Sequence, residues 1–378
     1  MTVPHRALRD KRSLPALTSL RFFAALAVVV SHLSERGIVP PLDGLVYFFD
    51  GGRTAVAFFF VLSGFVLTYN YRAFSGWRGI REFYLARIAR IYPTVLFAFV
   101  LAAIGVAYAY AHRAEGLLFS WYSLDDHVEI FLGASGVAQL LTATGWLPSA
   151  SLNQPWNGPA WSITCEMFFY ALFPALVVFL RRGRLARLLS ALSIVFALQL
   201  TWIFVVAPLF PPNQAGFLVS QFPLPHLPEF VAGVAAGISF ERGGREWLEG
   251  GVRREAFIGT GVFAFIALSQ FHPVNPAYLV MTPAFVLLVL GFAVAPRGSR
   301  SSWLAFGPLV LLGEASFALY LIHTPLINIY LIPDLPQQLG WGFMAVVLGI
   351  SIALFRFYET PARRLLRDRF TRPPQYGQ

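Results

Sequence analysis

Ten apolar runs dominate this sequence of 378 residues, and each is long enough to cross a lipid bilayer as a helix. They lie near residues 17–34, 53–71, 92–111, 160–180, 188–207, 223–240, 256–272, 277–295, 305–331 and 340–357. Hydrophobic residues make up 57% of the chain and charged residues 13%, well below the roughly 25% charged residues of soluble domains. The sequence therefore predicts an all-α, polytopic membrane bundle of about ten transmembrane helices.

Basic residues are concentrated in alternate loops between these runs. Lys11 is the only lysine, so the net charge of +10 comes almost entirely from arginine. The arginine-rich segments are 1–14, 72–90, 181–187, 242–254, 297–300 and 356–372. The intervening loops carry only Arg36, Arg53 and Arg113. Because short cytoplasmic loops are enriched in arginine and lysine, both termini are predicted to be cytoplasmic. The spread of arginines over short loops gives no reason to expect a nucleic-acid partner.

One apolar stretch, residues 131–145, is too short to span a bilayer. Counting it as a span would move every later arginine-rich loop to the outer side, against the charge rule. We therefore expect an interfacial or re-entrant piece here, within an outer segment that covers residues 112–158.

The sequence excludes several classes of site. Cys165 is the only cysteine, which rules out a disulfide framework and a thiolate metal site. The chain has no phosphate-binding glycine loop, dinucleotide fingerprint or zinc-protease spacing, so we expect no metal and no permanently bound cofactor. We expect a basic cytoplasmic tail (1–14), one integral-membrane domain (15–364) and a second basic cytoplasmic tail (365–378).

Arg21 and His32 lie in the first run, eleven positions apart. Eleven helical residues make about three turns, so both side chains project from one face, roughly 16 Å apart along the axis. Ionisable groups within a span are costly and usually face a pathway or a site. We interpret Arg21 as an anion-binding group and His32 as a base, since a neutral imidazole can accept a proton from a hydroxyl. The alternative is an interfacial histidine that donates to a backbone carbonyl.

Arg87 and Arg90 form a second candidate site, in the loop after the second run. They are i, i+3 neighbours just before Pro93, so a helix would place both on one face. Such a pair can bind a nucleotide or pyrophosphate. Taken alone, the pattern favours simple anchoring on the cytoplasmic side.

Polar residues within later runs are further candidates. Glu166 is the i+4 neighbour of Ser162, beside Trp161, and a carboxylate in an apolar run needs a cation or a hydroxyl partner. Tyr320 and His323 share one face of the ninth run. Each group fits either a catalytic site or a hydrogen-bonded contact between helices.

The ordered set of these residues resembles the acyltransferase-3 family of integral-membrane acyltransferases, which includes O-antigen and exopolysaccharide acetylases and macrolide acylases. The matching elements are Arg21 with His32, FFFVLSGF (58–65), Arg87-x-x-Arg90, Trp161-Ser162 with Glu166, Leu-Pro-Glu229-Phe, Tyr320-Leu-Ile-His323 and Glu359-Thr-Pro. Each element is weakly specific, but the ordered set is specific, and the resemblance runs from about residue 15 to 364.

The resemblance implies a donor and a mechanism. Acyl-CoA, with acetyl-CoA favoured, would dock from the cytoplasm with its phosphates on Arg87, Arg90 and Arg21. His32 would act as general base on an acceptor hydroxyl, or would carry the acyl group itself as a relay. Glu166 would orient His32 or the acceptor. The remaining family positions, expected to support the substrate or the structure, are Trp161, Ser162, Glu229, Tyr320 and His323.

The resemblance leaves the acceptor open. Many members carry an acidic or small polar residue just before the phenylalanine run, where this chain has Ala57. The implied partners are the lipid bilayer and a carbohydrate or glycosylated acceptor, in the inner membrane of a bacterium. A transporter or flippase for an anionic or glycosylated solute is the alternative, because such bundles also bury arginine, glutamate and histidine. A non-catalytic scaffold for polysaccharide assembly is a third reading.

Overall fold

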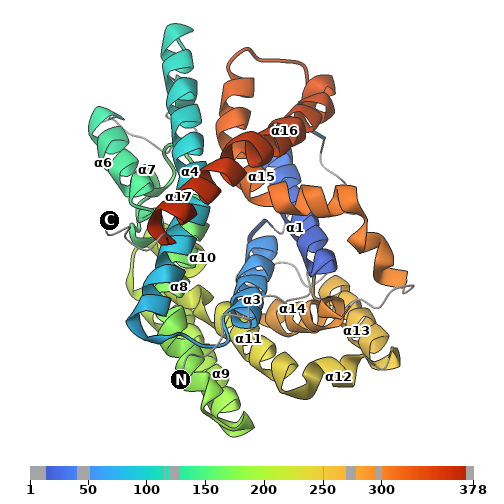
Figure 1. Ribbon diagram of the computed structural model, residues 1–378. Helices are drawn as coiled ribbons and strands as arrows, with labels where there is room; N and C mark the ends of the chain where they lie inside the picture. The colour runs from blue at the N-terminus through green and yellow to red at the C-terminus, as the bar shows by residue number, and fades with distance from the viewer. Residues whose placement is uncertain are drawn as a thin grey trace, which may run out of the picture.

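The computed structural model describes residues 14–40, 52–114, 116–118, 128–249, 251–269, 278–294 and 300–371. The described residues form helices and no strand. The helices are α1 (Pro15–Glu35), α3 (Gly52–Asn70), α4 (Gly76–Ala111), α6 (Val128–Leu140), α7 (Ala150–Asn153), α8 (Trp161–Arg181), α9 (Leu185–Thr201), α10 (Pro212–Ser220), α11 (Leu227–Ser239), α12 (Arg245–Leu248), α13 (Val252–Ser269), α14 (Tyr278–Ala293), α15 (Gly307–Leu331), α16 (Gly340–Leu354) and α17 (Thr360–Thr371) (Figure 1).

Each of the ten predicted spans corresponds to a helix, so the predicted helical membrane bundle is confirmed. Among the described residues, six helical segments are long and apolar enough to cross a membrane, and two shorter helices are also apolar. Helix α11 has 13 residues, but a 3-10 turn precedes it, so the helical path begins at Leu224. The chain leaves helical geometry at Arg242 and Gly243, where Gly243 has a φ of 116°, and this kink separates the sixth span from α12.

The third span continues toward the basic end as a helix beyond its apolar run. Helix α4 begins at Gly76 and continues for 36 residues through Pro93, so Arg87 and Arg90 lie within a helix. A proline removes one backbone donor and usually ends or kinks a helix. Here Pro93 is buried together with Ala89 and Ile91, and this packing compensates for the missing hydrogen bond.

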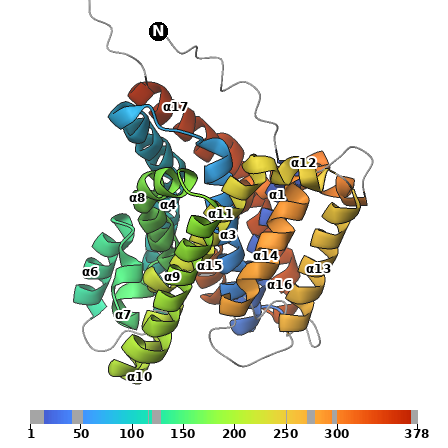
Figure 2. The same cartoon turned by 90° about the horizontal axis from the view of Figure 1, so that it is seen from below.

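The basic loops after the second, fourth and sixth spans meet at one end of the bundle. Glu241 forms ion pairs with Arg181 (2.6 Å) and Arg72 (3.2 Å), and Arg242 donates to the carbonyl of Arg181 (2.7 Å). Figure 2 shows α12 and α17 at this end, whereas α7 and α10 lie at the opposite end. The basic loops therefore lie at one end of the bundle, as their charges predict.

The short apolar stretch at 131–145 contains helix α6, whose 13 residues are about 20 Å long at 1.5 Å per residue. This length is below the roughly 30 Å of a bilayer core. Helix α6 packs against α7, on the side of the molecule away from α12 and α17 (Figure 2).

Two helix pairs pack closely around the centre because glycine lets their backbones approach. In the pair α3–α11, a Cβ at Gly64 would collide with the carbonyl of Phe230, and one at Gly233 would collide with that of Val61. In the pair α1–α15, a Cβ at Gly313 would collide with the carbonyl of Thr18. These contacts hold α1, α3, α11 and α15 together as the frame of the site.

Candidate active site

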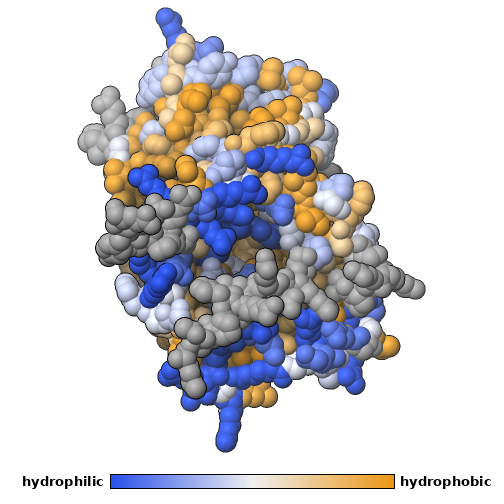
Figure 3. Space-filling view, in the orientation of Figure 1, coloured by the Kyte–Doolittle hydropathy of each residue, from blue (hydrophilic) through white to orange (hydrophobic). Residues whose placement is uncertain are grey.

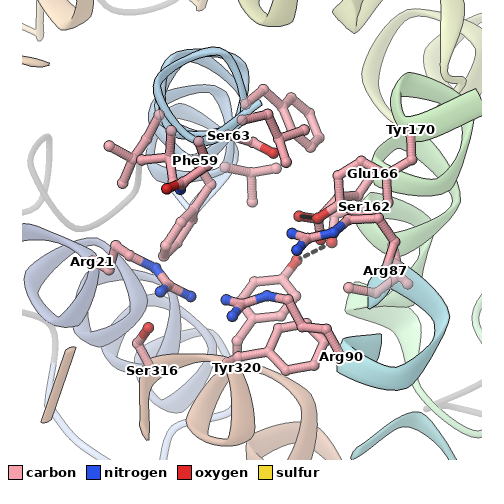
Figure 4. Close-up of a pocket in the computed structure, with 18 residues that line it drawn as sticks. Arg21, Phe59, Ser63, Arg87, Arg90, Ser162, Glu166, Tyr170, Ser316 and Tyr320 are labelled. Atoms are coloured by element: carbon pink, nitrogen blue, oxygen red, sulfur yellow. Dashed lines mark hydrogen bonds between the residues drawn. The ribbon is translucent and has the colours of Figure 1, made fainter. Parts of the chain in front are cut away.

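Three arginines from two helices converge on one cavity of about 250 Å³. Arg21 comes from α1, and Arg87 and Arg90 come from α4. Figure 4 shows the guanidinium groups of Arg21 and Arg90 pointing toward one another across the cavity. Seen from the α17 end of the bundle, hydrophilic residues gather across the middle of this face (Figure 3). The structure therefore brings Arg21 of the first span and the Arg87–Arg90 pair to the same cavity.

Among the described residues, the arginines of this cavity share its wall with one carboxylate, that of Glu166, but form no ion pair with it. No carboxylate within the described ranges lies within 4.0 Å of the nitrogens of Arg21, Arg87 or Arg90. Arg87 Nη2 donates to the hydroxyl of Tyr71 (3.3 Å), and the Nε of Arg87 is buried without a partner. A desolvated guanidinium binds phosphate or carboxylate strongly. The cavity is built to accept an anion.

Glu166 of α8 lines the same cavity. Its carboxylate accepts a hydrogen bond from the hydroxyl of Tyr170, one helical turn further along α8. Tyr170 also lines the cavity and was not among the candidate residues, although its i+4 spacing from Glu166 is visible in the sequence. We expected this carboxylate to have a cation or a hydroxyl as its partner, and the partner is the Tyr170 hydroxyl. The Ser162 hydroxyl instead contacts Pro159 and Tyr320.

A second cavity, of about 430 Å³, lies beyond the arginine cavity and contains His32. Glu35, Gln154, Trp161 and Gln221 also line it, so an indole, a carboxylate and two amides surround the imidazole. We call the two spaces the arginine cavity and the histidine cavity. A smaller cavity of about 130 Å³ is also lined by His32, Glu35 and Gln154.

Val56 and Tyr320 line both cavities and therefore form the partition between them. The Tyr320 hydroxyl lies 2.8 Å from Ser162 Oγ and donates to the carbonyl of Pro159 (3.0 Å). These bonds hold the ring between α15 and the start of α8. The arginine-cavity side of the partition is apolar and includes Phe59 and Phe60.

His32 is paired with a second histidine from α15. His32 Nδ1 lies 2.8 Å from His323 Nε2, and the ring planes are 14° apart. His323 is fully buried, and its Nδ1 lies 2.7 Å from the carbonyl oxygen of Tyr320. Nothing in the sequence linked the two histidines, because they are 291 positions apart and meet only when α1 packs on α15.

The expected partnership of Glu166 with His32 requires a correction. Glu166 lines the arginine cavity and is hydrogen-bonded to Tyr170, whereas His32 lines the histidine cavity. The His32 imidazole forms a hydrogen bond with His323. Its position in the sequence predicted Glu166 near the outer end of its span. In the structure its carboxylate lies in the cavity that Arg21, Arg87 and Arg90 line.

Two other predicted residues have structural contacts. Trp161 packs on the ring of His226, with centroids 5.3 Å apart, and presents its indole to the histidine cavity. Glu229 is fully buried in the first turn of α11 and accepts a hydrogen bond from Gln199 Nε2 (3.3 Å). Glu229 therefore joins α11 to α9, and it lines neither cavity.

The family model of an acyltransferase domain matches residues 14–356. The acyltransferase MdmB of Streptomyces mycarofaciens is 29% identical over 97% of this chain and 95% of its own length. The O-acetyltransferase OatA of Staphylococcus aureus is 23% identical over 93% of this chain, and the peptidoglycan O-acetyltransferase OatA of Listeria monocytogenes is 24% identical over 94%. This chain spans only 58% and 56% of the lengths of those two proteins. No solved structure matches the chain.

Proposed function

This chain belongs to the acyltransferase-domain family and is a multi-pass membrane O-acyltransferase, and on that premise we propose its donor, base and acceptor. The donor is acyl-CoA, with acetyl-CoA favoured, and it enters from the arginine-rich end. The base is His32. The acceptor is a hydroxyl of a carbohydrate or of a glycosylated small molecule, bound in the histidine cavity.

The observation that carries the proposal is the arrangement of the two cavities, which share Val56 and Tyr320 as their partition. The phosphates of CoA are polyanionic and pair with Arg21, Arg87 and Arg90. The pantetheine arm then follows the apolar wall toward the partition. Arg21 and His32 are roughly 16 Å apart along α1, a distance that an extended arm can bridge.

The transfer step needs one proton acceptor at the partition. The acceptor oxygen attacks the thioester carbonyl carbon while its proton moves to His32. The C–S bond then breaks, and the CoA thiolate leaves and takes the proton from the His32 imidazolium. General base catalysis of this kind contributes typically about 10²–10⁴-fold in rate.

The acceptor class follows from the walls of the histidine cavity. Trp161 presents an indole to it, while Glu35, Gln154 and Gln221 offer a carboxylate and two amides. An aromatic surface with hydrogen-bonding side chains at its edge suits a sugar ring with its hydroxyls. One of the relatives is named as a peptidoglycan O-acetyltransferase, which supports a glycan hydroxyl as the acceptor.

Mass spectrometry of glycans and secondary metabolites tests the proposal in cells that produce the wild type or His32→Ala. We expect an acylated product only with the wild type. Because the arginine cavity is intact in His32→Ala, the purified variant should bind CoA as the wild type does. His112→Ala is the matched control, since His112 is an exposed histidine at the end of α4. Export of a solute of unchanged mass would instead identify a transporter, and full turnover by His32→Ala would refute the base.

A further inference from the structure

We infer that His323 is a positioning residue, which holds His32 in the tautomer with its proton on Nδ1 and so leaves the lone pair on Nε2. This inference rests on the proposed function, because it concerns the base of that reaction. It is carried by a chain of two hydrogen bonds, from His32 to His323 and from His323 to the backbone carbonyl of Tyr320.

The first step concerns the proton of His323. Its Nδ1 lies 2.7 Å from the carbonyl oxygen of Tyr320, and a carbonyl oxygen can only accept a hydrogen bond. If Nδ1 carried a lone pair instead, two acceptors would face each other at that distance. His323 is also fully buried, and no acidic side chain forms an ion pair with it in the part of the chain that the structure describes. A buried unpaired charge is costly, so His323 is neutral with its single proton on Nδ1.

The second step transfers this assignment to His32. Because the neutral His323 ring has its proton on Nδ1, its Nε2 is an acceptor. His32 Nδ1 lies 2.8 Å from that nitrogen, so His32 Nδ1 must be the donor. The Thr324 hydroxyl lies 3.1 Å from the same Nε2, whose single lone pair accepts from His32, and the hydroxyl can rotate its proton away from this nitrogen. The proton of a neutral His32 is therefore on Nδ1.

The third step is the consequence for the reaction. In a histidine, the hydrogen bond made by one ring nitrogen sets which nitrogen is free to act as base. With Nδ1 committed to His323, the acceptor proton moves to Nε2 of His32. The imidazolium then donates a charge-assisted hydrogen bond from Nδ1 to His323, and such bonds are roughly twice as strong as neutral ones. His323 thus supports His32 most when the positive charge forms.

Steady-state kinetics of three variants test this role, with acetyl-CoA as the donor and the acceptor identified by mass spectrometry. For His323→Leu we expect kcat to fall about 10–100-fold, as is typical when a supporting partner is removed. KM for acetyl-CoA should not change, since His323 does not line the arginine cavity. His323→Gln should recover most of kcat, because its amide oxygen can accept from His32 Nδ1. His112→Leu is the matched control and should retain kcat, since His112 is an exposed histidine that lines neither cavity.

The tautomer itself can be read without any turnover. Solid-state NMR of the wild-type protein labelled with ¹⁵N-histidine should show His32 protonated on Nδ1, with its signals assigned by their loss in His32→Asn. An Nε2-protonated His32, or full kcat in His323→Leu, would overturn the positioning role even where acyl transfer is confirmed. Absence of acyl transfer by the wild type would instead refute the proposed function, so the two failures are distinguishable.

Discussion

At the residue scale, the arginine cavity is unusual because, among the described residues, three guanidinium groups share it with a single lining carboxylate, that of Glu166. Arg87 lies over the ring of Tyr71 (5.6 Å) and Arg90 over that of Phe317 (5.9 Å), and such contacts stabilise a desolvated cation. Unpaired charges within a membrane protein are costly and usually mark a substrate pathway.

The first prediction concerns these arginines. The double variant Arg87→Ala/Arg90→Ala should raise KM for acyl-CoA at least about 10-fold, since one hydrogen bond to a charged group contributes about 1.5–3 kcal/mol. The matched control is Arg78→Ala/Arg81→Ala, which removes the same charge at the same spacing from the exposed start of α4. Calorimetric titration with CoA measures the corresponding loss of binding affinity. If both double variants lost the same CoA affinity, Arg87 and Arg90 would serve only to orient the chain in the membrane.

The second prediction separates Glu166 from the acceptor. Glu166 is the only acid among the described residues that line the arginine cavity. Its replacement by glutamine removes repulsion of the donor phosphates, so KM for acyl-CoA should fall while KM for the acceptor stays constant. Glu314→Gln is the control, because Glu314 is exposed on α15 and lines neither cavity. A loss of kcat in Glu166→Gln with no change in KM for acyl-CoA would contradict this prediction and indicate that Glu166 acts in proton transfer.

At the element scale, the histidine pair depends on how closely α1 and α15 pack. Thr18 and Gly313 meet near one end of this helix pair, whereas His32 and His323 meet further along both helices. The fully buried Ser19 also donates to the carbonyl of Leu304 (2.6 Å), which anchors α1 beside the approach to α15. Two helices in such contact cannot shift past each other without separating the imidazoles.

The third prediction follows from this contact. Gly313→Ala places a methyl group against the carbonyl of Thr18, and overpacking of this kind destabilises by about 1–3 kcal/mol. We expect a lower thermal unfolding temperature in detergent and a lower kcat. Gly349→Ala is the matched control, because it lies within α16 with open space around it and should be neutral or slightly stabilising. A Gly313→Ala protein as stable and as active as the wild type would contradict the role of this contact.

At the scale of the whole molecule, the bundle places its two cavities at different depths. The arginine cavity is nearer the end that carries the basic loops, and the histidine cavity lies beyond Tyr320. The charge rule places the basic end in the cytoplasm, where acyl-CoA is available. The acceptor would then be reached from the opposite side of the same partition.

The fourth prediction tests this orientation by cysteine labelling in a Cys165→Ser background, where Cys165 is the buried free cysteine. Cysteines at Leu209 and Asp334 should react with a membrane-impermeant maleimide in intact cells. Those at Arg184 and Leu365 should react only after permeabilisation. All four positions are exposed on the protein surface, so none is shielded by packing within the bundle. The reverse pattern would invert the topology.

The helices and the alternation of basic and non-basic loops follow from the sequence, because span length and loop charge are local properties of the chain. The same holds for Arg21 and His32, whose shared face depends only on helical periodicity. The start of α4 at Gly76 was missed, since Pro93 and the arginines before it resemble a loop in sequence.

The composition of each cavity could not be predicted, because it depends on which helices become neighbours and at what rotation. Spacing within one helix could not show that Glu166 turns toward Arg21 and Arg87, or that His323 meets His32 across 291 positions. Those contacts arise from close backbone approaches such as that of Gly313 to Thr18. Long-range packing of this kind is a property of side-chain shape in three dimensions, and it gathers the arginines around one cavity and pairs His32 with His323 beside another.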